Sequence, residues 1–283
     1  MKIINELRTE FKLPHLLQAT KMPRTSYYYQ RKIASRPREY AIERTELRQI
    51  CTENKGRYGY RRATLALREI GAHMNHKVVM RLMSEEGLTC RLRAKRYRSS
   101  VEMLNYTTPD LIKRNFKADR PNRKWVTDIT EFKLFGKKMY LSVVLDLYCR
   151  EVVGYELSKR STYEMVDSSL QKALARVKVG DGLILHSDHG WHYKMAEHLN
   201  TLSRYGIRQS MSRKGNCYDN CVIENFFGML KTEFYDNQKF SSIEEFGAEL
   251  EKFMQYYNNV RIKCDLKGSS PTSYRASRFP MTI

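Results

Sequence analysis

The chain lacks several features, and each absence excludes a class of protein. No stretch approaches the roughly 18 uninterrupted apolar residues of a transmembrane helix, and the N-terminal residues contain no long apolar segment of the kind found in secretory signals. The six cysteines form no CxxC pair, so we interpret them as reduced thiols rather than as disulfides or zinc ligands. We therefore expect a cytoplasmic protein with no membrane attachment.

Acidic residues are also in short supply. The chain has 31 Asp and Glu against 51 Lys and Arg, a net charge of +20, which favours a polyanionic partner. Residues 1–120 hold 27 basic and 12 acidic side chains, whereas residues 121–283 hold 24 and 19. The basic excess is greatest in the run 91–98, where five of eight residues are cationic and Tyr97 lies among them, as in segments that contact nucleic-acid phosphates.

The pattern of helix signals divides the first part of the chain. Residues 1–38 predict a helical basic arm that Pro23 interrupts, with Thr25 or Ser26 as cap of its second helix; a helix-turn-helix arm and a solvated arm both fit. Residues 39–92 predict three short helices: one with Ile42, Leu47, Ile50 and Cys51 on its apolar face, one over 61–70, and one over 76–86 capped by Asn75. This is the pattern of a helix-turn-helix DNA-binding module, although a plain helical scaffold also fits. Residues 93–122 are predicted to form a basic linker.

Residues 123–240 predict the main domain. Strands are expected at 124–132, 138–146, 150–158, 182–187 and 206–211, with a hairpin turn at 136–138 and helices at 162–177, 193–205 and 219–235. This order describes a mixed five-stranded sheet with flanking helices, an α/β fold. Residues 241–283 predict a helix with Phe246, Leu250 and Phe253 on one face, followed by a basic tail. We expect this helix to cover the flank of the domain, with DNA contact by Arg261, Lys263 and Lys267 as the alternative.

Three carboxylates hold special positions in this domain. Asp128 lies in the middle of an apolar, β-branched run, Asp188 ends a second run just before Gly190, and Glu224 lies on a helix. We expect two strands and one helix to bring them to one edge of the sheet. Three hard oxygen ligands are what Mg²⁺ or Mn²⁺ accepts while keeping positions open for phosphate and water, and two such ions suit phosphoryl transfer. Asp146 is the rival ligand, although capping of the following turn would also explain it.

Several motifs around these acids carry a family resemblance. The segments Trp125-Val126-Thr127-Asp128, His186-Ser187-Asp188-His189-Gly190 and Ser210 to Asn220 leading to Glu224-Asn225 resemble the DDE transposases of bacterial insertion sequences. The likeness is greatest to the OrfB-type chain of insertion sequence family three, relatives of retroviral integrases, and covers almost the whole chain. It implies an RNase H-like fold for the main domain and matches Arg57 to Arg62 to the family's helix-turn-helix module. His189 and Cys221 stand where the family usually has Gln and Ala.

The resemblance implies a function and a set of functional residues. Asp128, Asp188 and Glu224 would be the catalytic residues and would bind two Mg²⁺ (or Mn²⁺) ions for strand cleavage and strand transfer. Lys231, seven residues after Glu224 and thus on the same helical face, matches a basic position thought to touch DNA. The full set expected to contact DNA is Arg57, Arg61, Arg62, Lys77, Arg81, Arg93, Lys95, Arg96, Arg98, Lys214 and Lys231.

Partners follow from the same resemblance. The chain would bind element ends and target DNA as a homo-oligomer in the cytoplasm, on the nucleoid, and could act as a fusion with an upstream reading-frame product. Two alternatives stay open: a sequence-specific DNA-binding regulator with an inactive core, and a nuclease that cuts without joining. His186, His189 and His192 recur at every third position around Asp188, yet in a loop this spacing favours individual roles over a metal cluster.

Overall fold

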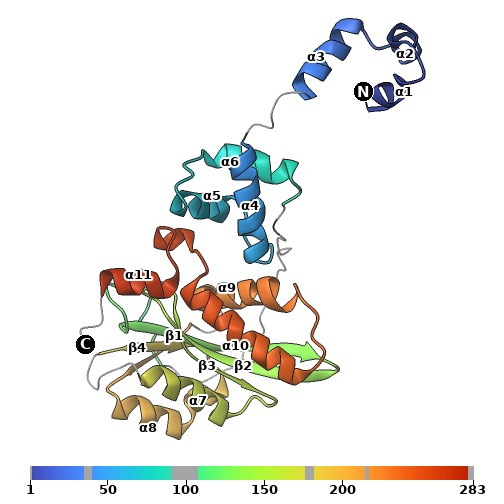
Figure 1. The fold of residues 1–283 in the computed structure, drawn as a ribbon. Helices are drawn as coiled ribbons and strands as arrows, with labels where there is room; N and C mark the ends of the chain where they lie inside the picture. The colour runs from blue at the N-terminus through green and yellow to red at the C-terminus, as the bar shows by residue number, and fades with distance from the viewer. Residues whose placement is uncertain are drawn as a thin grey trace.

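The structure is a computed structural model, and it describes residues 2–34, 40–88, 90, 108–175, 182–213 and 217–279. Figure 1 shows an N-terminal helical arm, a three-helix module and a larger α/β domain. The basic run 91–98 and residue 214 lie outside the described residues. The predictions for Arg93, Lys95, Arg96, Arg98 and Lys214 therefore stay predictions.

Three helices form the N-terminal arm. They are α1 (Lys2–Leu7), α2 (Leu13–Ala19) and α3 (Arg24–Ala34). The expected cap at Thr25 or Ser26 is wrong, because α3 already begins at Arg24 and the Pro23 carbonyl accepts the Tyr27 amide. Proline has the φ of a helix start and cannot continue the preceding helix, so the chain turns there.

The three-helix module agrees with the predicted organisation. Its helices are α4 (Ala41–Glu53), α5 (Tyr60–Glu69) and α6 (His76–Glu85). The Asn75 side chain accepts the Lys77 amide, which confirms the predicted cap. The expected role of Ile42 is wrong, since Ile42 is 74% exposed. At 3.6 residues per turn it lies about 140° around the helix from the buried Leu47.

A mixed five-stranded sheet forms the centre of the larger domain, as predicted. Its strands are β1 (Lys124–Leu134), β2 (Lys137–Asp146), β3 (Val152–Ser158), β4 (Ile184–Ser187) and β5 (Arg208–Met211). Their order is β3-β2-β1-β4-β5. The first three strands form an antiparallel meander, and β4 pairs in parallel with both β1 and β5. The hairpin between β1 and β2 turns at Phe135 and Gly136, both at positive φ.

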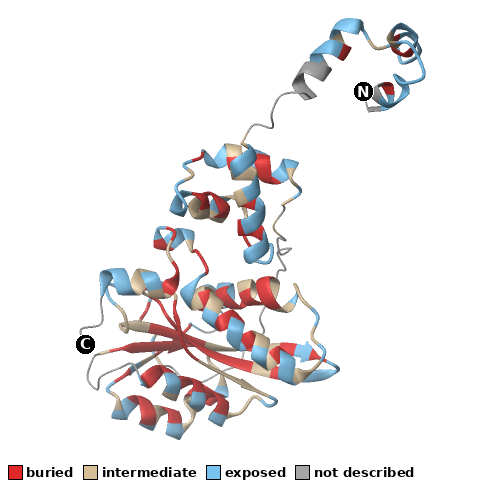
Figure 2. Ribbon diagram, in the orientation of Figure 1, coloured by how far each residue is buried: buried red, intermediate tan, exposed pale blue. Residues whose placement is uncertain are grey.

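Helices cover both faces of the sheet (Figures 1 and 2), and most strand residues between them are buried. One face carries α7 (Tyr163–Leu174), η1 (Trp191–Lys194) and α8 (Ala196–Arg204), and the other carries α9 (Cys221–Leu230) and α10 (Ile243–Asn259). The 3₁₀ turns η2 (Cys217–Asn220) and η4 (Cys264–Leu266), the π-helical η3 (Lys231–Tyr235) and α11 (Pro271–Arg278) complete the domain. No described helix has both the length and the apolarity needed to cross a bilayer.

The helix expected over 219–235 is in fact three consecutive segments, η2, α9 and η3. As predicted, α10 covers the flank of the sheet, with Phe246, Leu250 and Phe253 buried in the same cluster as β1 and α9. The alternative role of Arg261 in DNA contact is wrong, since Arg261 is 7% exposed and bonds Glu233 through two nitrogens. Segments after α10 thus belong to the packed domain.

Candidate active site

Asp128 lies in the middle of β1, on the face of the sheet covered by α9. Its neighbours on that face, Val126 and Phe132, pack with Ile223 of α9, because alternate residues of a strand point the same way. One carboxylate oxygen of Asp128 accepts the Ile129 amide at 2.7 Å, and the other accepts the Asn220 Nδ2 at 3.3 Å. The carboxylate is therefore held from both β1 and η2.

Asp188 follows the last residue of β4. The register pairs Val126 with His186, and two further residues bring the chain to Asp128 on β1 and to Asp188 beside it. Its Oδ1 accepts the Gly190 amide at 2.8 Å. A side chain at position 190 would place its Cβ 3.0 Å from that oxygen and 3.2 Å from the ring of Tyr193, so Asp188 or Tyr193 would have to shift to admit it.

Glu224 lies in the first turn of α9, exposed to solvent. Burial raises the pKa of Asp128 to about 8, and repulsion from Asp188 and Glu224 adds to the shift. Burial and repulsion from Asp188 likewise raise the pKa of Glu224. Asp128 and Glu224 thus interact electrostatically with Asp188, as expected if β1, β4 and α9 bring the three carboxylates near one another.

The carboxylates do not form a closed cage. Among the described residues, no three His, Cys, Asp or Glu side chains lie in the geometry of a ready-made metal site. The donor set nevertheless fits a hard divalent cation, since it consists of carboxylate oxygens whose mutual repulsion a cation would relieve. A preformed cage is unnecessary where phosphate and water supply further ligands.

Asp219 and Asn220 directly precede α9 and are residue types that favour a helix cap, but the structure gives them other roles. Asn220 donates to Asp128 instead, and its own Oδ1 is buried without a hydrogen-bond partner among the residues that the structure describes. Asp219 is 1% exposed and accepts from the guanidinium groups of Arg213 and Arg114, which hold the pKa of its carboxyl well below the usual range. No spacing pattern in the sequence indicates that Asn220 faces Asp128, because the contact joins residues 92 positions apart.

The three histidines have separate roles, as predicted. His186 is fully buried between the Ser210 hydroxyl and the Asp219 carbonyl. His189 lies 2.7 Å from the Ser212 carbonyl through Nε2, and His192 lies 3.1 Å from the Ser161 hydroxyl. These contacts tie the loop after β4 to β5, η2 and the start of α7.

Two aromatic residues of the same loop differ in exposure. Trp191 is 56% exposed and stacks on His192 at 3.9 Å, so it stays available to a base. Tyr193 is 1% exposed and packs with Met165 of α7 and Met211 of β5, on the face of the sheet opposite the Glu224 helix. The loop therefore offers one surface aromatic beside Asp188.

Asp146, the rival ligand, is used within the fold. It is fully buried, and its two oxygens accept the amides of Asn122 and Tyr148 at 2.8 Å. The interpretation as a turn cap is therefore the one that the structure supports. Arg150, in the same turn, has a φ of 60°, which ends the turn before β3 begins at Val152.

Lys231 lies two turns along the helix from Glu224. Its Nζ is 5.6 Å from the centre of the Phe132 ring, and Phe132 projects from β1 on the same face as Asp128. The contact fixes the direction of the Lys231 side chain, and its predicted placement on the Glu224 side of the helix stays a prediction.

The cationic residues of the three-helix module fall into two groups. Arg61, Lys77 and Arg81 are exposed. Arg57 and Arg62 instead turn towards the larger domain: Arg57 is 7% exposed and donates to the Glu233 carbonyl at 3.0 Å, and Arg62 pairs with the Glu233 carboxylate at 3.1 Å. Their predicted role in DNA contact is not consistent with this placement. We refer to Arg57, Arg62, Glu233 and Arg261 as the interdomain joint.

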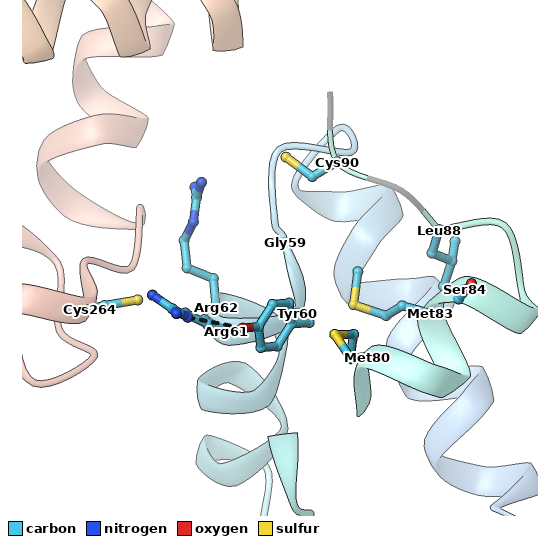
Figure 3. A pocket seen from close by; sticks show the side chains of 10 residues that line it. All are labelled: Gly59, Tyr60, Arg61, Arg62, Met80, Met83, Ser84, Leu88, Cys90 and Cys264. Carbon is cyan, nitrogen blue, oxygen red and sulfur yellow. Dashed lines mark hydrogen bonds between the residues drawn. The ribbon is translucent and has the colours of Figure 1, made fainter. Parts of the chain in front are cut away.

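A cavity of about 460 Å³ lies in the module, away from the three carboxylates. Figure 3 shows Met80, Met83 and Leu88 along one side and Arg61, hydrogen-bonded to Tyr60, towards Cys264 on the other. Its walls are largely apolar side chains. It contributes no group to the chemistry of the carboxylates.

Comparison with known proteins agrees with this geometry. Two models described as integrase core domain match residues 118–217 and 224–279, and a model described as HTH-like domain matches residues 37–96. The sheet with its edge carboxylates and the upstream module thus define an integrase-core protein with a helix-turn-helix-like module.

Comparison with similar proteins identifies the family within this class. The chain is 46% identical over 279 residues to the putative transposase InsK for insertion sequence element IS150 of Escherichia coli K12, covering 99% of both chains. It is 33% identical to the transposase InsF for insertion sequence IS3A of the same organism, covering 96% of both chains. The HTLV-2 integrase catalytic core domain matches with 19% identity and a TM-score of 0.45, over 56% of this chain and 98% of that one. The chain belongs to the IS3 family of insertion-sequence transposases.

Proposed function

We propose that this transposase hydrolyses a phosphodiester at each element end and then joins the freed 3′-hydroxyl to target DNA, using Asp128, Asp188 and Glu224. The observation that carries this proposal is the electrostatic coupling of these carboxylates; burial, with added repulsion from Asp188 and Glu224, raises the pKa of Asp128 to about 8. Clustered carboxylates of this kind cost stability unless a cation joins them.

The same residues would hold Mg²⁺ or Mn²⁺, two ions in our proposal. When bound, such ions activate the attacking oxygen and stabilise the leaving oxygen. The chain supplies the alignment: Asn220 and the Ile129 amide orient Asp128, and the Gly190 amide orients Asp188. Lys231 would hold the substrate strand through a phosphate, on the side of the site marked by Phe132.

DNA contact is assigned to the exposed cations. Arg61, Lys77 and Arg81 of the module and the basic residues Arg93, Lys95, Arg96, Arg98 and Lys214 would bind phosphates. A transposase must bring two ends together, so we also propose a homo-oligomer on DNA, on the nucleoid in the cytoplasm, with an upstream reading-frame product as a possible fusion partner.

The test compares the full chain with Asp188→Asn on duplexes that carry the element's terminal sequence, with Mg²⁺ present. We expect cleaved and joined products from the unmodified chain and neither from the variant, while DNA binding is retained. Asp167→Asn is the matched control, because Asp167 lies on α7, on the other face of the sheet. Binding without cleavage would indicate a regulator, cleavage without joining a nuclease, and cleavage by Asp188→Asn would contradict the site.

A further inference from the structure

We propose a phosphate-binding site behind the helix that carries Glu224. A cavity of about 260 Å³ lies between the turn before β3, α9 and the segment after α10. Its lining includes three cations and one acid: Arg150, Arg261, Lys263 and Asp265. This volume is about that of nine waters at ~30 Å³ each, which is room for a phosphate group and a few waters.

Arg150 presents an unused donor. Its Nη1 is buried and has no hydrogen-bond partner in the described part of the chain. Its backbone is fixed, because the Arg150 carbonyl accepts the Tyr257 hydroxyl at 2.7 Å. A buried guanidinium nitrogen without a partner costs free energy that an anionic acceptor would recover.

Lys263, which lines the same cavity, also carries a charge that is only weakly neutralised. Its side chain is 18% exposed, and its nearest carboxylate, that of Asp265, is 3.9 Å away and itself 60% exposed. Burial lowers the pKa of Lys263 to about 8, with Arg261 and Arg150 adding to the shift. The cavity thus gathers positive charge that the protein itself does not neutralise.

Arg261 does not change this balance. Its Nε and Nη2 bind Glu233 at 2.8 and 2.7 Å, and Glu233 also pairs with Arg62. Four cations therefore share two carboxylates around the cavity, which leaves an excess for a bound anion. A phosphate is the anion that best matches a forked guanidinium next to an ammonium.

The helix supports the same ligand. Val222 and Asn225 line the cavity from one side of α9, near the end at which the helix dipole is positive. These residues lie about 100° to 200° around the helix from Glu224. A phosphate bound there would brace the catalytic helix from behind, and a DNA strand is its most immediate source in a transposase.

The test measures how inorganic phosphate changes the Tm of the metal-free full chain, at constant ionic strength set with chloride. We expect phosphate to raise the Tm of the unmodified chain and of Lys252→Met, a control on the exposed side of α10. Lys263→Met should raise the Tm without phosphate, because it removes a buried unneutralised charge, and should weaken phosphate binding about tenfold or more. Arg150→Gln should weaken it as well.

The source of the phosphate is decided by DNA titration. If a DNA backbone phosphate occupies the site, Lys263→Met should lower the slope of log affinity for DNA against log salt concentration by about one unit. An unchanged slope together with lost phosphate binding would assign the site to free phosphate. Equal phosphate responses in the unmodified chain, Lys263→Met and Lys252→Met would overturn the proposal. Asp188→Asn should keep the phosphate response, so failure of the catalytic proposal is seen separately.

Discussion

At the scale of single residues, part of the carboxylate site could be predicted from the sequence. The residue types at 128, 188 and 224 and their association with strands and a helix could be predicted from the sequence, because they depend on local patterns. The hydrogen-bond partner of Asp128 could not be predicted. Asn220 is distant from Asp128 in the sequence and has the sequence features of an ordinary helix cap. The same limit applies to Arg57 and Arg62. The sequence suggests exposed side chains for both, but in the structure both donate hydrogen bonds to Glu233.

The raised pKa of Asp128 predicts a pH effect on stability. The folded chain retains this proton up to pH about 8, whereas the unfolded chain releases it near its ordinary value of about 4. The stabilisation is therefore complete at low pH and is lost as pH rises towards 8. In metal-free protein, Asp128→Asn should reduce the fall in unfolding free energy between about pH 5 and pH 9 by a few kcal/mol, measured by urea denaturation. Identical pH profiles would contradict the assigned pKa.

The tight turn at Gly190 predicts a second effect. In Gly190→Ala the new Cβ would meet Asp188 Oδ1 and the buried Tyr193 ring, so we expect cleavage to fall about 100-fold while the chain still folds. Gly247→Ala is the matched control, because its Cβ would meet nothing closer than 3.8 Å on a helix interior. That control should keep full activity and gain up to about 1 kcal/mol of stability. Equal activities of the two variants would refute the positioning role of Gly190.

At the scale of elements, most strands and helices could be predicted within a few residues. The antiparallel meander and the later parallel strands follow from apolar runs and turn residues, which are local. The break of the expected 219–235 helix into η2, α9 and η3 has no local sequence signal, and Glu233 within η3 is contacted by Arg57 and Arg261, which lie far along the chain. π-helical turns often occur at functional positions, and this one directly follows the Glu224 helix.

The interdomain joint predicts a large loss of stability. Glu233→Gln would leave the buried Arg261 and the half-buried Arg62 without a counter-charge, which typically costs about 3–5 kcal/mol. Arg48→Gln is the control, since Arg48 is 49% exposed and pairs with Glu86 within the module. It should cost at most about 1 kcal/mol. Urea denaturation of both variants measures the difference, and similar losses would show that the joint contributes no more than a surface ion pair.

At the scale of the molecule, composition predicted a nucleic-acid partner and the family motifs predicted the domain plan. What sequence reasoning missed is that the module and the larger domain are joined. The Tyr58 hydroxyl accepts the Ile262 amide, Ile262 packs into the core of the module, and Asn54 accepts the Tyr256 hydroxyl. These contacts join segments about 200 residues apart, beyond any local pattern.

Divalent metal should stabilise the whole molecule through the carboxylates. We expect Mg²⁺ to raise the Tm of the unmodified chain by relieving the repulsion at Asp128, and to have a much smaller effect in Asp128→Asn and Asp188→Asn. Because protonated Asp128 cannot bind a cation, the Mg²⁺ response should weaken as pH falls below about 8. A Mg²⁺ response of equal size in all three proteins would place the ion elsewhere.

The interdomain joint also has a consequence for the spacing of sites along DNA. Because Arg57 lies between Glu233 and the rings of Phe253 and Tyr256, the three-helix module has little freedom to move relative to the larger domain. If the module binds the element end as proposed, the distance from the recognised bases to the cleaved bond is fixed. An end lengthened by half a helical turn between them should then still be bound but not cleaved.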